Sequence, residues 1–388
     1  MKKPGVSRDV AVLFATRIAR LFAYGLVSVI LVLYLAARGV SESRIGILLF
    51  LTLAGDTLIS LFLTVRADAI GRRKVLIVSS LLVVIAGVVF ATTGNYVLLL
   101  IAATIGVISP SGNEVGPFLA VEQVVLSQTA TGAGRVSLFA WYNLVGSFAT
   151  AIGALVAGQA VTWLQHQGRT PLASYGATLW AYALSGLILA LMFALLTPAA
   201  ETTEPPRPAS ARFHLVSSGP VVARLSALFA LDSFGGGFVV QALVAYWFHV
   251  RYGLDPAMLG RLFFGANLIA GFSALAAAGI ARRIGLLRTM VFTHLPSNVL
   301  LILVPLMPNV NLAMTMLLLR FSISQMDVPS RQAYVMSVVP PTDRSAAAGI
   351  TGVARTIGAS IAPLIATPLM GSRAYGWIPF VLAGGFKI

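Results

Sequence analysis

Long apolar stretches recur along almost the whole chain, and they constrain its fold more than any other feature. A membrane-crossing helix needs about 20 consecutive apolar residues. No stretch alternates at period two, so a barrel is not indicated. Because backbone groups in lipid must find their hydrogen bonds within the segment, we expect an all-α membrane protein with twelve transmembrane helices. The stretches lie at about 10–37, 44–66, 75–94, 96–127, 136–163, 175–197, 220–249, 258–281, 286–307, 310–338, 345–370 and 374–388.

The composition excludes a water-soluble protein. Charged residues make up 10% of the chain and hydrophobic residues 58%, whereas a soluble domain has roughly 25% and 45–50%. So few charges cannot cover a water-facing surface, which rules out a soluble enzyme, a disordered chain and a soluble nucleic-acid binder. Cysteine is absent, so disulfides and thiolate metal sites are excluded. No phosphate-binding loop, metal-ligand spacing or nucleophile–base pair is recognisable, so we expect no enzyme activity, cofactor or metal.

The basic residues behind the net charge of +15 indicate how the chain is oriented in the membrane. If the N-terminus is cytoplasmic, fourteen basic residues fall on the inner side and six on the outer side, as the positive-inside rule requires. We therefore expect a multi-pass protein of the cell (inner or plasma) membrane. The inner residues are Lys2, Lys3, Arg8, Arg66, Arg72, Arg73, Lys74, Arg135, Arg207, Arg212, Arg282, Arg283, Arg288 and Arg344, and the outer ones are Arg38, Arg44, Arg169, Arg251, Arg261 and Arg373.

One polar, Pro-rich segment, 198–219, interrupts the otherwise short loops and is typical of a linker. We expect a six-helix bundle over 1–197, a cytoplasmic linker over 198–219, and a second six-helix bundle over 220–388. The final stretch offers only about 15 positions against the roughly 20 needed to cross. The last helix is therefore expected to be truncated, with Lys387 near mid-membrane.

The two halves repeat each other at a fixed offset. The loop Arg38–Gly46 corresponds to Tyr252–Gly260, and the loop Ala67–Lys74 corresponds to Ala281–Arg288. Parallel repeats of six helices each are the layout of one large transporter class.

The chain resembles the major facilitator superfamily over essentially its whole length. The family pattern between the second and third helices is Gly, three residues, Asp, two residues, Gly, Arg and further basic residues. Asp68, Gly71 and Arg72 match this pattern, and Thr64 replaces the first Gly. The resemblance implies two pseudo-symmetric six-helix bundles around a central cavity, with alternating access.

The motif and the membrane acids are similar to those of the drug/proton antiporter branch. That branch has a Gly-rich motif with Pro on its fifth helix, whereas this chain has glycines there without a proline. The basic motif of its fourth helix is also missing. The glycines are Gly146, Gly153 and Gly158.

The matched loop implies an inner gate. Gly71 permits a tight turn, and the Asp68 carboxylate can face a neighbouring helix N-terminus, where the dipole favours negative charge. Arg72 is expected to pair with an acid at the inner end of the fourth stretch, where Glu122 stands. The alternative is that the basic residues of this loop only follow the orientation rule.

Several charged residues are expected near mid-depth. A charge at the bilayer centre costs about 2.5–3.5 kcal/mol on insertion scales, so these residues are candidates for function. Arg17, Arg20 and Arg224 lie nearer the inner face, where long side chains can reach the headgroups. The mid-depth residues are Asp56, Glu114, Asp232, Asp327 and Arg355.

Two prolines and two glycines surround Glu114 in the segment Ser109–Pro117. Proline removes backbone hydrogen bonds and glycine admits close approach. A broken helix at the midplane is how transporters build ligand sites. Glu114 is therefore the first candidate for proton coupling, with Asp56 and Asp232 as alternatives.

The stretch 310–338 places Arg320, Asp327 and Arg331 on one helical face. Pro329 is expected to interrupt the helix between Asp327 and Arg331. Arg355 has a matching depth, so Asp327 is expected to pair with Arg331 or Arg355, either to fix packing or to line the cavity. His294 is expected to serve packing. Further cavity candidates are Asn143, Gln241 and Asn267.

These observations favour a secondary active transporter of a small solute, driven by protons and directed to export. One alternative is a uniporter or proton symporter for a nutrient or organic anion, with Arg331 and Arg355 as an anion clamp. Another is a non-transporting receptor on the same scaffold. The expected partners are a small molecule, protons and the lipid bilayer; we expect a monomer and no nucleic-acid binding.

Overall fold

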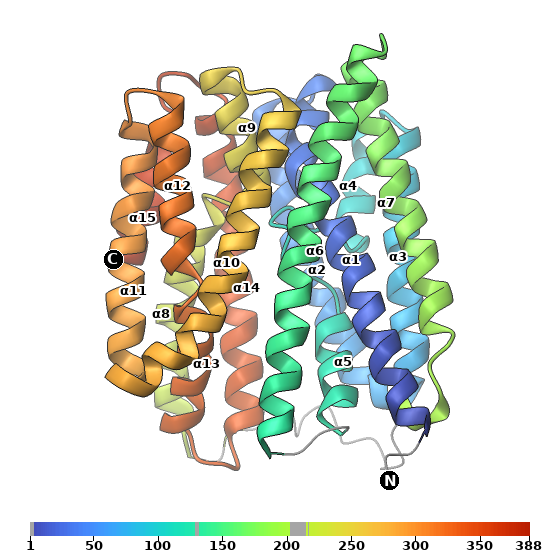
Figure 1. Cartoon of the computed structure of the whole chain (residues 1–388), viewed down its shortest axis with the longest axis vertical. Helices are drawn as coiled ribbons and strands as arrows, with labels where there is room; N and C mark the ends of the chain where they lie inside the picture. The colour runs from blue at the N-terminus through green and yellow to red at the C-terminus, as the bar shows by residue number, and fades with distance from the viewer. Residues whose placement is uncertain (1–3, 129–131, 202–214, 216) are drawn as a thin grey trace. The chain divides into compact units, whose positions relative to one another are not determined.

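The structure is a computed structural model that describes residues 4–128, 132–201, 215 and 217–388. The regular elements of this described chain are all helices (Figure 1). They are α1 (Pro4–Ala37), α2 (Glu42–Ile70), α3 (Arg72–Thr92), α4 (Tyr96–Ile105), α5 (Phe118–Ser127), α6 (Gly132–His166), α7 (Pro171–Phe193), α8 (Gly219–Gly237), α9 (Gln241–Tyr252), α10 (Pro256–Ile284), α11 (Leu286–Leu303), α12 (Val310–Ser324), α13 (Asp327–Val338), α14 (Arg344–Met370) and α15 (Ile378–Lys387), with short 3-10 turns η1 (Pro198–Ala200) and η3 (Val304–Leu306).

The chain divides into two compact units. Unit 1 contains residues 1–41, 54–206 and 255–264, and unit 2 contains residues 42–53, 207–254 and 265–388. Helices α2 and α10 therefore contribute residues to both units. Most of the expected linker, 202–214 and 216, lies outside the described residues, so the boundaries of the linker and of the two bundles stay predictions.

Within the described residues, nine helices are long and apolar enough to cross a membrane. Three shorter apolar helices, α4, α5 and α15, fall below that length. The stretches 96–127 and 310–338 are each divided into two helices, and the last stretch forms a helix of only 10 residues. The all-helical membrane fold is thus confirmed, whereas the number of twelve crossings stays a prediction.

The interruption of 96–127 has a local cause. Helix α4 ends at Ile105 and α5 begins at Phe118, and the segment between them contains Pro110 and Pro117. Gly112 and Gly116 adopt φ of 70° and 78°, a left-handed conformation that glycine accepts without strain. The segment that carries Glu114 is therefore non-helical, as its prolines and glycines predicted.

The interruption of 310–338 lies between α12 and α13. Pro329 has no N–H to donate to the carbonyl of Gln325, and in a helix its ring would clash with that carbonyl. The break therefore precedes Asp327, and the expectation of a break between Asp327 and Arg331 was wrong. Asp327 stands in the first turn of α13, where the helix dipole favours a carboxylate.

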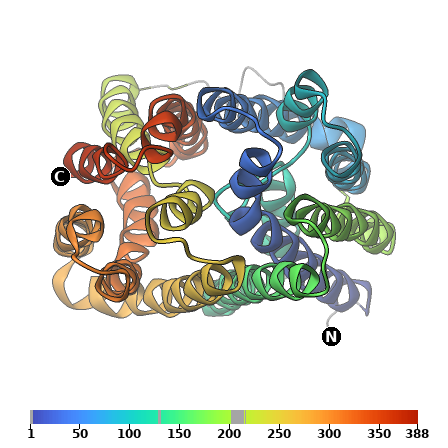
Figure 2. The ribbon, with the colours of Figure 1, turned by 90° about the horizontal axis from the view of Figure 1, so that it is seen from above.

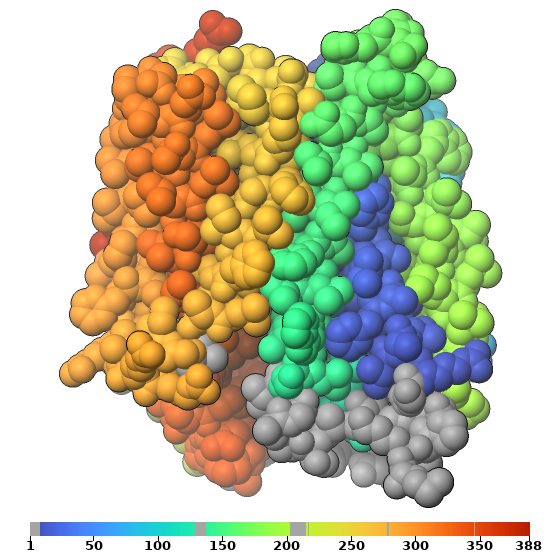
Figure 3. Space-filling view, viewed as in Figure 1, coloured from blue at the N-terminus to red at the C-terminus, as the bar shows by residue number. Residues whose placement is uncertain are grey.

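In unit 1, α1 packs along α6 and α7 (Figures 1 and 2). The N-terminal part of α1 (blue) lies at the surface between them (Figure 3), whereas residues 23–35 are all buried. A Cβ added to Gly25 would stand 2.2 Å from the carbonyl oxygen of Thr150, and one added to Gly153 would stand 2.1 Å from that of Phe22. Glycine thus lets the α1 and α6 backbones touch.

In unit 2, α8 packs along α14 through glycines in the same way. A Cβ added to Gly237 would stand 2.2 Å from the carbonyl oxygen of Ala359, and one added to Gly358 would stand 2.2 Å from that of Ala230. Helix α11 contacts α12, α13 and α15, and α15 also contacts α8 (Figure 1). Side chains from α8, α11, α13 and α15 can therefore meet inside this unit.

Replacing Gly153 by valine should destabilise unit 1. Overpacking a tight contact costs about 1–3 kcal/mol, so we expect a lower melting temperature and less monodisperse protein in detergent. Gly176→Val is the matched control, because an added Cβ at this α7 position meets no atom within 4 Å. Equal melting temperatures of the two variants would contradict the close α1–α6 crossing.

Candidate functional site

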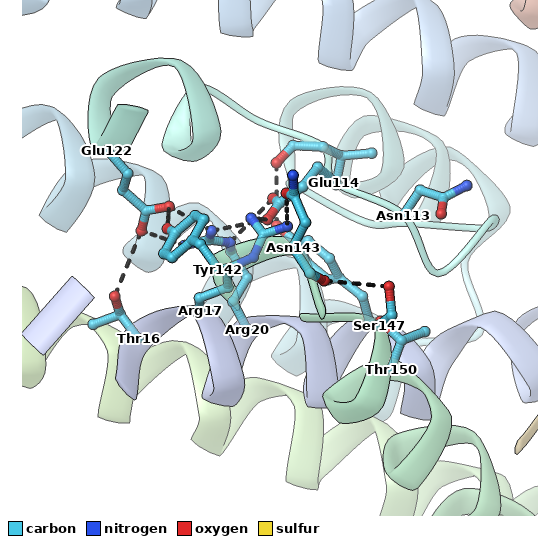
Figure 4. Close-up of polar contacts among 12 residues, drawn as sticks. Thr16, Arg17, Arg20, Asn113, Glu114, Glu122, Tyr142, Asn143, Ser147 and Thr150 are labelled. Carbon is cyan, nitrogen blue, oxygen red and sulfur yellow. Dashed lines mark hydrogen bonds and ion pairs between the residues drawn. The ribbon is translucent and has the colours of Figure 1, made fainter. Parts of the chain in front are cut away.

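Inside unit 1, two arginines of α1 meet two glutamates of the interrupted fourth stretch (Figure 4). Arg17 Nη1 lies 2.5 Å from Glu114 Oε1, and Arg20 Nη2 lies 3.0 Å from the same oxygen. Arg20 also donates to both carboxylate oxygens of Glu122, at 2.7 Å each. Two cations and two carboxylates therefore balance one another. We call these four residues the unit 1 cluster.

The Arg20–Glu122 pair is the buried core of this cluster, since both side chains are 0% exposed. Their two parallel hydrogen bonds form the bidentate arrangement that is strong for Arg and a carboxylate. The Tyr142 hydroxyl donates to Glu122, and the Phe118 ring lies 4.6 Å from the guanidinium carbon of Arg20.

Two expectations from the sequence were wrong here. Arg20 does not reach the headgroups, because a carboxylate partner lies beside it inside the unit. Glu122 does not pair with Arg72, because Arg20 occupies both of its oxygens.

Arg17 and Glu114 form the more accessible part of the cluster. Glu114 keeps 15% of its side chain exposed, the largest fraction of the four residues. Arg17 Nη2 also donates to Asn143 Oδ1 at 3.2 Å, and its guanidinium carbon lies 4.2 Å from the Tyr142 ring centre. Arg17 is itself buried, so it is held by partners rather than by headgroups. Asn143, a cavity candidate from the sequence, thus belongs to this cluster.

Asp56 of α2 approaches the same non-helical segment. Its Oδ1 accepts a hydrogen bond from the Gly116 backbone N–H at 2.6 Å and another from the Ser60 hydroxyl at 3.2 Å. No cation of the described chain pairs with this carboxyl group. Asp56 therefore differs from Glu114, which two guanidinium groups hold.

The matched loop forms a separate charged site at the α2–α3 turn. Gly71 adopts φ of 106°, as the tight turn requires. Arg72 Nε donates to Asp68 Oδ1 at 3.0 Å, and Arg72 Nη1 donates to the Ala200 carbonyl oxygen at 3.3 Å. The loop therefore ties α2 to the segment that follows α7.

Glu201 occupies the N-terminus of α3. It accepts hydrogen bonds from the backbone N–H groups of Arg72 and Arg73, at 2.7 and 3.1 Å. A carboxylate is stabilised there by unpaired N–H groups and the helix dipole. The sequence assigned a role of this kind to Asp68, but the carboxylate that caps α3 belongs to Glu201.

Inside unit 2, Asp232 of α8 gathers three basic groups. Its Oδ1 lies 2.7 Å from Lys387 Nζ and 3.0 Å from His294 Nε2, and its Oδ2 lies 3.0 Å from Arg331 Nη1. Asp327 Oδ2 lies 3.4 Å from Arg331 Nη1 and 3.5 Å from His294 Nδ1. Both ring nitrogens of His294 thus face carboxylates, an arrangement that a doubly protonated ring satisfies. We call these five residues the unit 2 cluster.

Of the two pairings expected for Asp327, the structure forms the one with Arg331. Arg355 of α14 instead donates through Nε to the Ser233 hydroxyl at 3.3 Å. The remaining candidates from the sequence, Gln241 and Asn267, hydrogen-bond to each other at 3.1 Å. The predicted site residues therefore separate into one ionic cluster in each unit, the α2–α3 loop, the Gln241–Asn267 pair, and two residues outside the clusters, Asp56 and Arg355.

Three polar residues gained a role that the sequence did not give them. His294 was expected to serve packing. Its acidic neighbours, Asp232 and Asp327, come from α8 and α13, so the sequence around His294 does not indicate them. Glu201 stood in a segment that was expected to be a linker. The sequence did indicate that Lys387 has an acidic partner, since an ammonium group near mid-membrane needs a counter-charge. Nothing in the sequence identified Asp232 as that partner.

Comparison with known proteins supports a transporter fold. The family model described as Major Facilitator Superfamily matches residues 13–384. An uncharacterized membrane protein of Saccharomyces cerevisiae is 30% identical over 414 aligned positions, which cover 98% of this chain and 92% of the relative.

Three solved transporters share the fold. The human organic anion transporter matches with a TM-score of 0.65 and 17% identity, over 99% of this chain and 98% of its own. The nucleoside transporter NupG matches with a TM-score of 0.72 and 14% identity, over 98% and 96%. A D-xylose–proton symporter matches with a TM-score of 0.70 and 15% identity, over 97% and 96%. Their solutes differ, so the fold does not select one.

The Arg20–Glu122 pair should be needed for stability. Removing one partner of a buried ion pair costs about 3–5 kcal/mol, so Arg20→Gln and Glu122→Gln should each lower the melting temperature of the purified protein. The double variant should lose less than the sum of the two losses, because neither charge is then left alone. Arg169→Gln, at an exposed position, is the control. Strictly additive losses would show that the two side chains are not coupled.

Proposed function

Because the chain belongs to the Major Facilitator Superfamily, we propose that it moves a small solute across the membrane by alternating access and couples this movement to protons. The family and the structural neighbours make the protein a transporter rather than an enzyme. One of the neighbours is named as a proton symporter, which supports a proton-coupled scheme on this fold.

The environment of Asp56 is the observation that supports proton coupling. Its carboxyl group lies inside a membrane helix without a cationic partner among the described residues, and it accepts a hydrogen bond from the Gly116 N–H of the non-helical segment. The charged or titratable groups within its electrostatic range are Glu114, Tyr24 and Tyr182. A carboxyl group of this kind can hold a proton while it is away from water and release it when water enters. The geometry therefore favours Asp56 over Glu114 as the proton carrier.

We assign the direction as export and the place as the cell membrane with a cytoplasmic N-terminus. The excess of basic residues on one set of loops supports this orientation. The Asp68 and Arg72 motif, which resembles that of the drug/proton antiporters, supports export. The protein functions as a monomer in this proposal, since each ionic cluster is complete within one chain.

Asp56→Asn should abolish solute movement driven by a pH gradient while leaving solute exchange, because the proton carrier is lost and the solute site is kept. The measurement is the fluorescence of pyranine inside proteoliposomes on addition of nucleosides, pentoses or carboxylates. Asp255→Asn is the control: Asp255 caps α10 by accepting from the Met258 N–H at 2.7 Å, and asparagine also caps.

Two outcomes would count against this proposal. Solute-driven proton flux that survives in Asp56→Asn would move the carrier to Glu114 or Asp232. Solute movement in the wild type without any proton flux would make the protein a uniporter.

The loop at α2–α3 should act as a gate that is held by the Asp68–Arg72 pair. A hydrogen bond to a charged group contributes about 1.5–3 kcal/mol, so Asp68→Asn should slow transport about tenfold or more while solute binding is kept. Lys74→Gln, an exposed change in the same loop, should transport like the wild type. Full transport by Asp68→Asn would remove the gate role.

A further inference from the structure

Basic groups outnumber carboxylates around the unit 2 cluster. The two carboxylates are those of Asp232 and Asp327, and both are already engaged by Lys387, Arg331 and His294. Two further arginines, Arg320 and Arg355, lie within electrostatic range of these acids. Four cationic side chains, those of Lys387, Arg331, Arg320 and Arg355, therefore share two carboxylates inside one unit of a membrane protein.

Within the described residues, Arg355 and Arg320 form no ion pair with a carboxylate. Arg355 Nε donates to the Ser233 hydroxyl, a neutral acceptor, at 3.3 Å. Arg320 Nε is buried and, within the described part of the chain, has no hydrogen-bond partner. A guanidinium group without a counter-charge is costly in a membrane interior, and that cost falls when an anion binds beside it.

The protein does not completely enclose the cluster. His294 and Asp232 keep 24% and 18% of their side chains exposed. A guanidinium group presents a planar fork of N–H donors that matches a carboxylate. The unit 1 cluster offers no such surplus, because its two arginines and two glutamates balance.

We infer that the transported solute is a small organic anion, and that its carboxylate binds Arg355 beside the unit 2 cluster. This inference rests on the proposed transport function, to which it adds the class of solute. The excess charge of the site matches an anion that carries one or two carboxylates. A neutral sugar or nucleoside would leave the Arg355 guanidinium group uncompensated.

The test is a thermal-shift titration of the purified protein with benzoate, succinate and citrate, each compared with its uncharged amide. At least one acid should raise the melting temperature, and its amide should not. The affinity for that acid should fall at least about tenfold in Arg355→Gln, because a bidentate charged contact is lost. Arg288→Gln, an exposed change on α11 in the same unit, should keep the wild-type shift.

The melting temperature without solute separates a binding role from a structural one. If Arg355 serves an anion, Arg355→Gln should melt at the wild-type temperature or above it, because an uncompensated charge is removed. A large loss of stability in the solute-free variant would mean that Arg355 holds the fold, and would overturn the inference.

The remaining outcomes are distinguishable from failure of the transport proposal. Stabilisation by the amides as much as by the acids, or by none of the acids, overturns the anion assignment. Stabilisation by phosphatidylglycerol alone would place a lipid headgroup at Arg355 instead of a solute. If an acid binds but drives no proton flux in proteoliposomes, the anion site is supported and the proton-coupled function is contradicted. If only neutral solutes drive proton flux, the proton-coupled function is supported and the anion site is contradicted.

Discussion

A charge inside a membrane protein is costly unless an opposite charge lies beside it, and each interrupted stretch brings such partners together. In unit 1 the non-helical segment between α4 and α5 brings Glu114 to Arg17 and Arg20, while α5 brings Glu122 to Arg20. In unit 2 the break before α13 places Asp327 in a first turn, one turn before Arg331. Each break costs backbone hydrogen bonds and is offset by ionic contacts.

The two units meet the constraint with the signs of charge exchanged. In unit 1 the first helix, α1, carries the arginines, and the interrupted fourth stretch carries the glutamates. In unit 2 the corresponding first helix, α8, carries Asp232, and the interrupted stretch carries Arg320 and Arg331 together with a second acid, Asp327, so the exchange of sign is partial. The exchange is balanced in unit 1 and leaves surplus cations in unit 2. This asymmetry is why we assign proton coupling to Asp56 in unit 1 and the anion to unit 2.

Much of the fold was predictable, because a long apolar stretch in lipid has to satisfy its backbone hydrogen bonds internally and therefore forms a helix. The broken segment around Glu114 was also predictable, since its prolines and glycines act locally. Most ion pairs were not predictable. The spacing of Asp327 and Arg331 along one helix indicates their pairing, but the partners of Arg20, His294 and Lys387 come from other helices. The assignment of Glu122 to Arg72 failed for this reason, since it rested on the family resemblance and on the place of Glu122 at the inner end of the fourth stretch.

The central claim is that unit 2 holds cations that only an anionic solute balances. The most direct measurement is the transient current when a carboxylate is applied rapidly to proteoliposomes on a solid-supported membrane, since an anion that enters the site moves charge as it binds. We expect a binding current with the acid, none with its uncharged amide, and a strongly reduced current in Arg355→Gln. An equal current with acid and amide, or an undiminished current in Arg355→Gln, would contradict the claim.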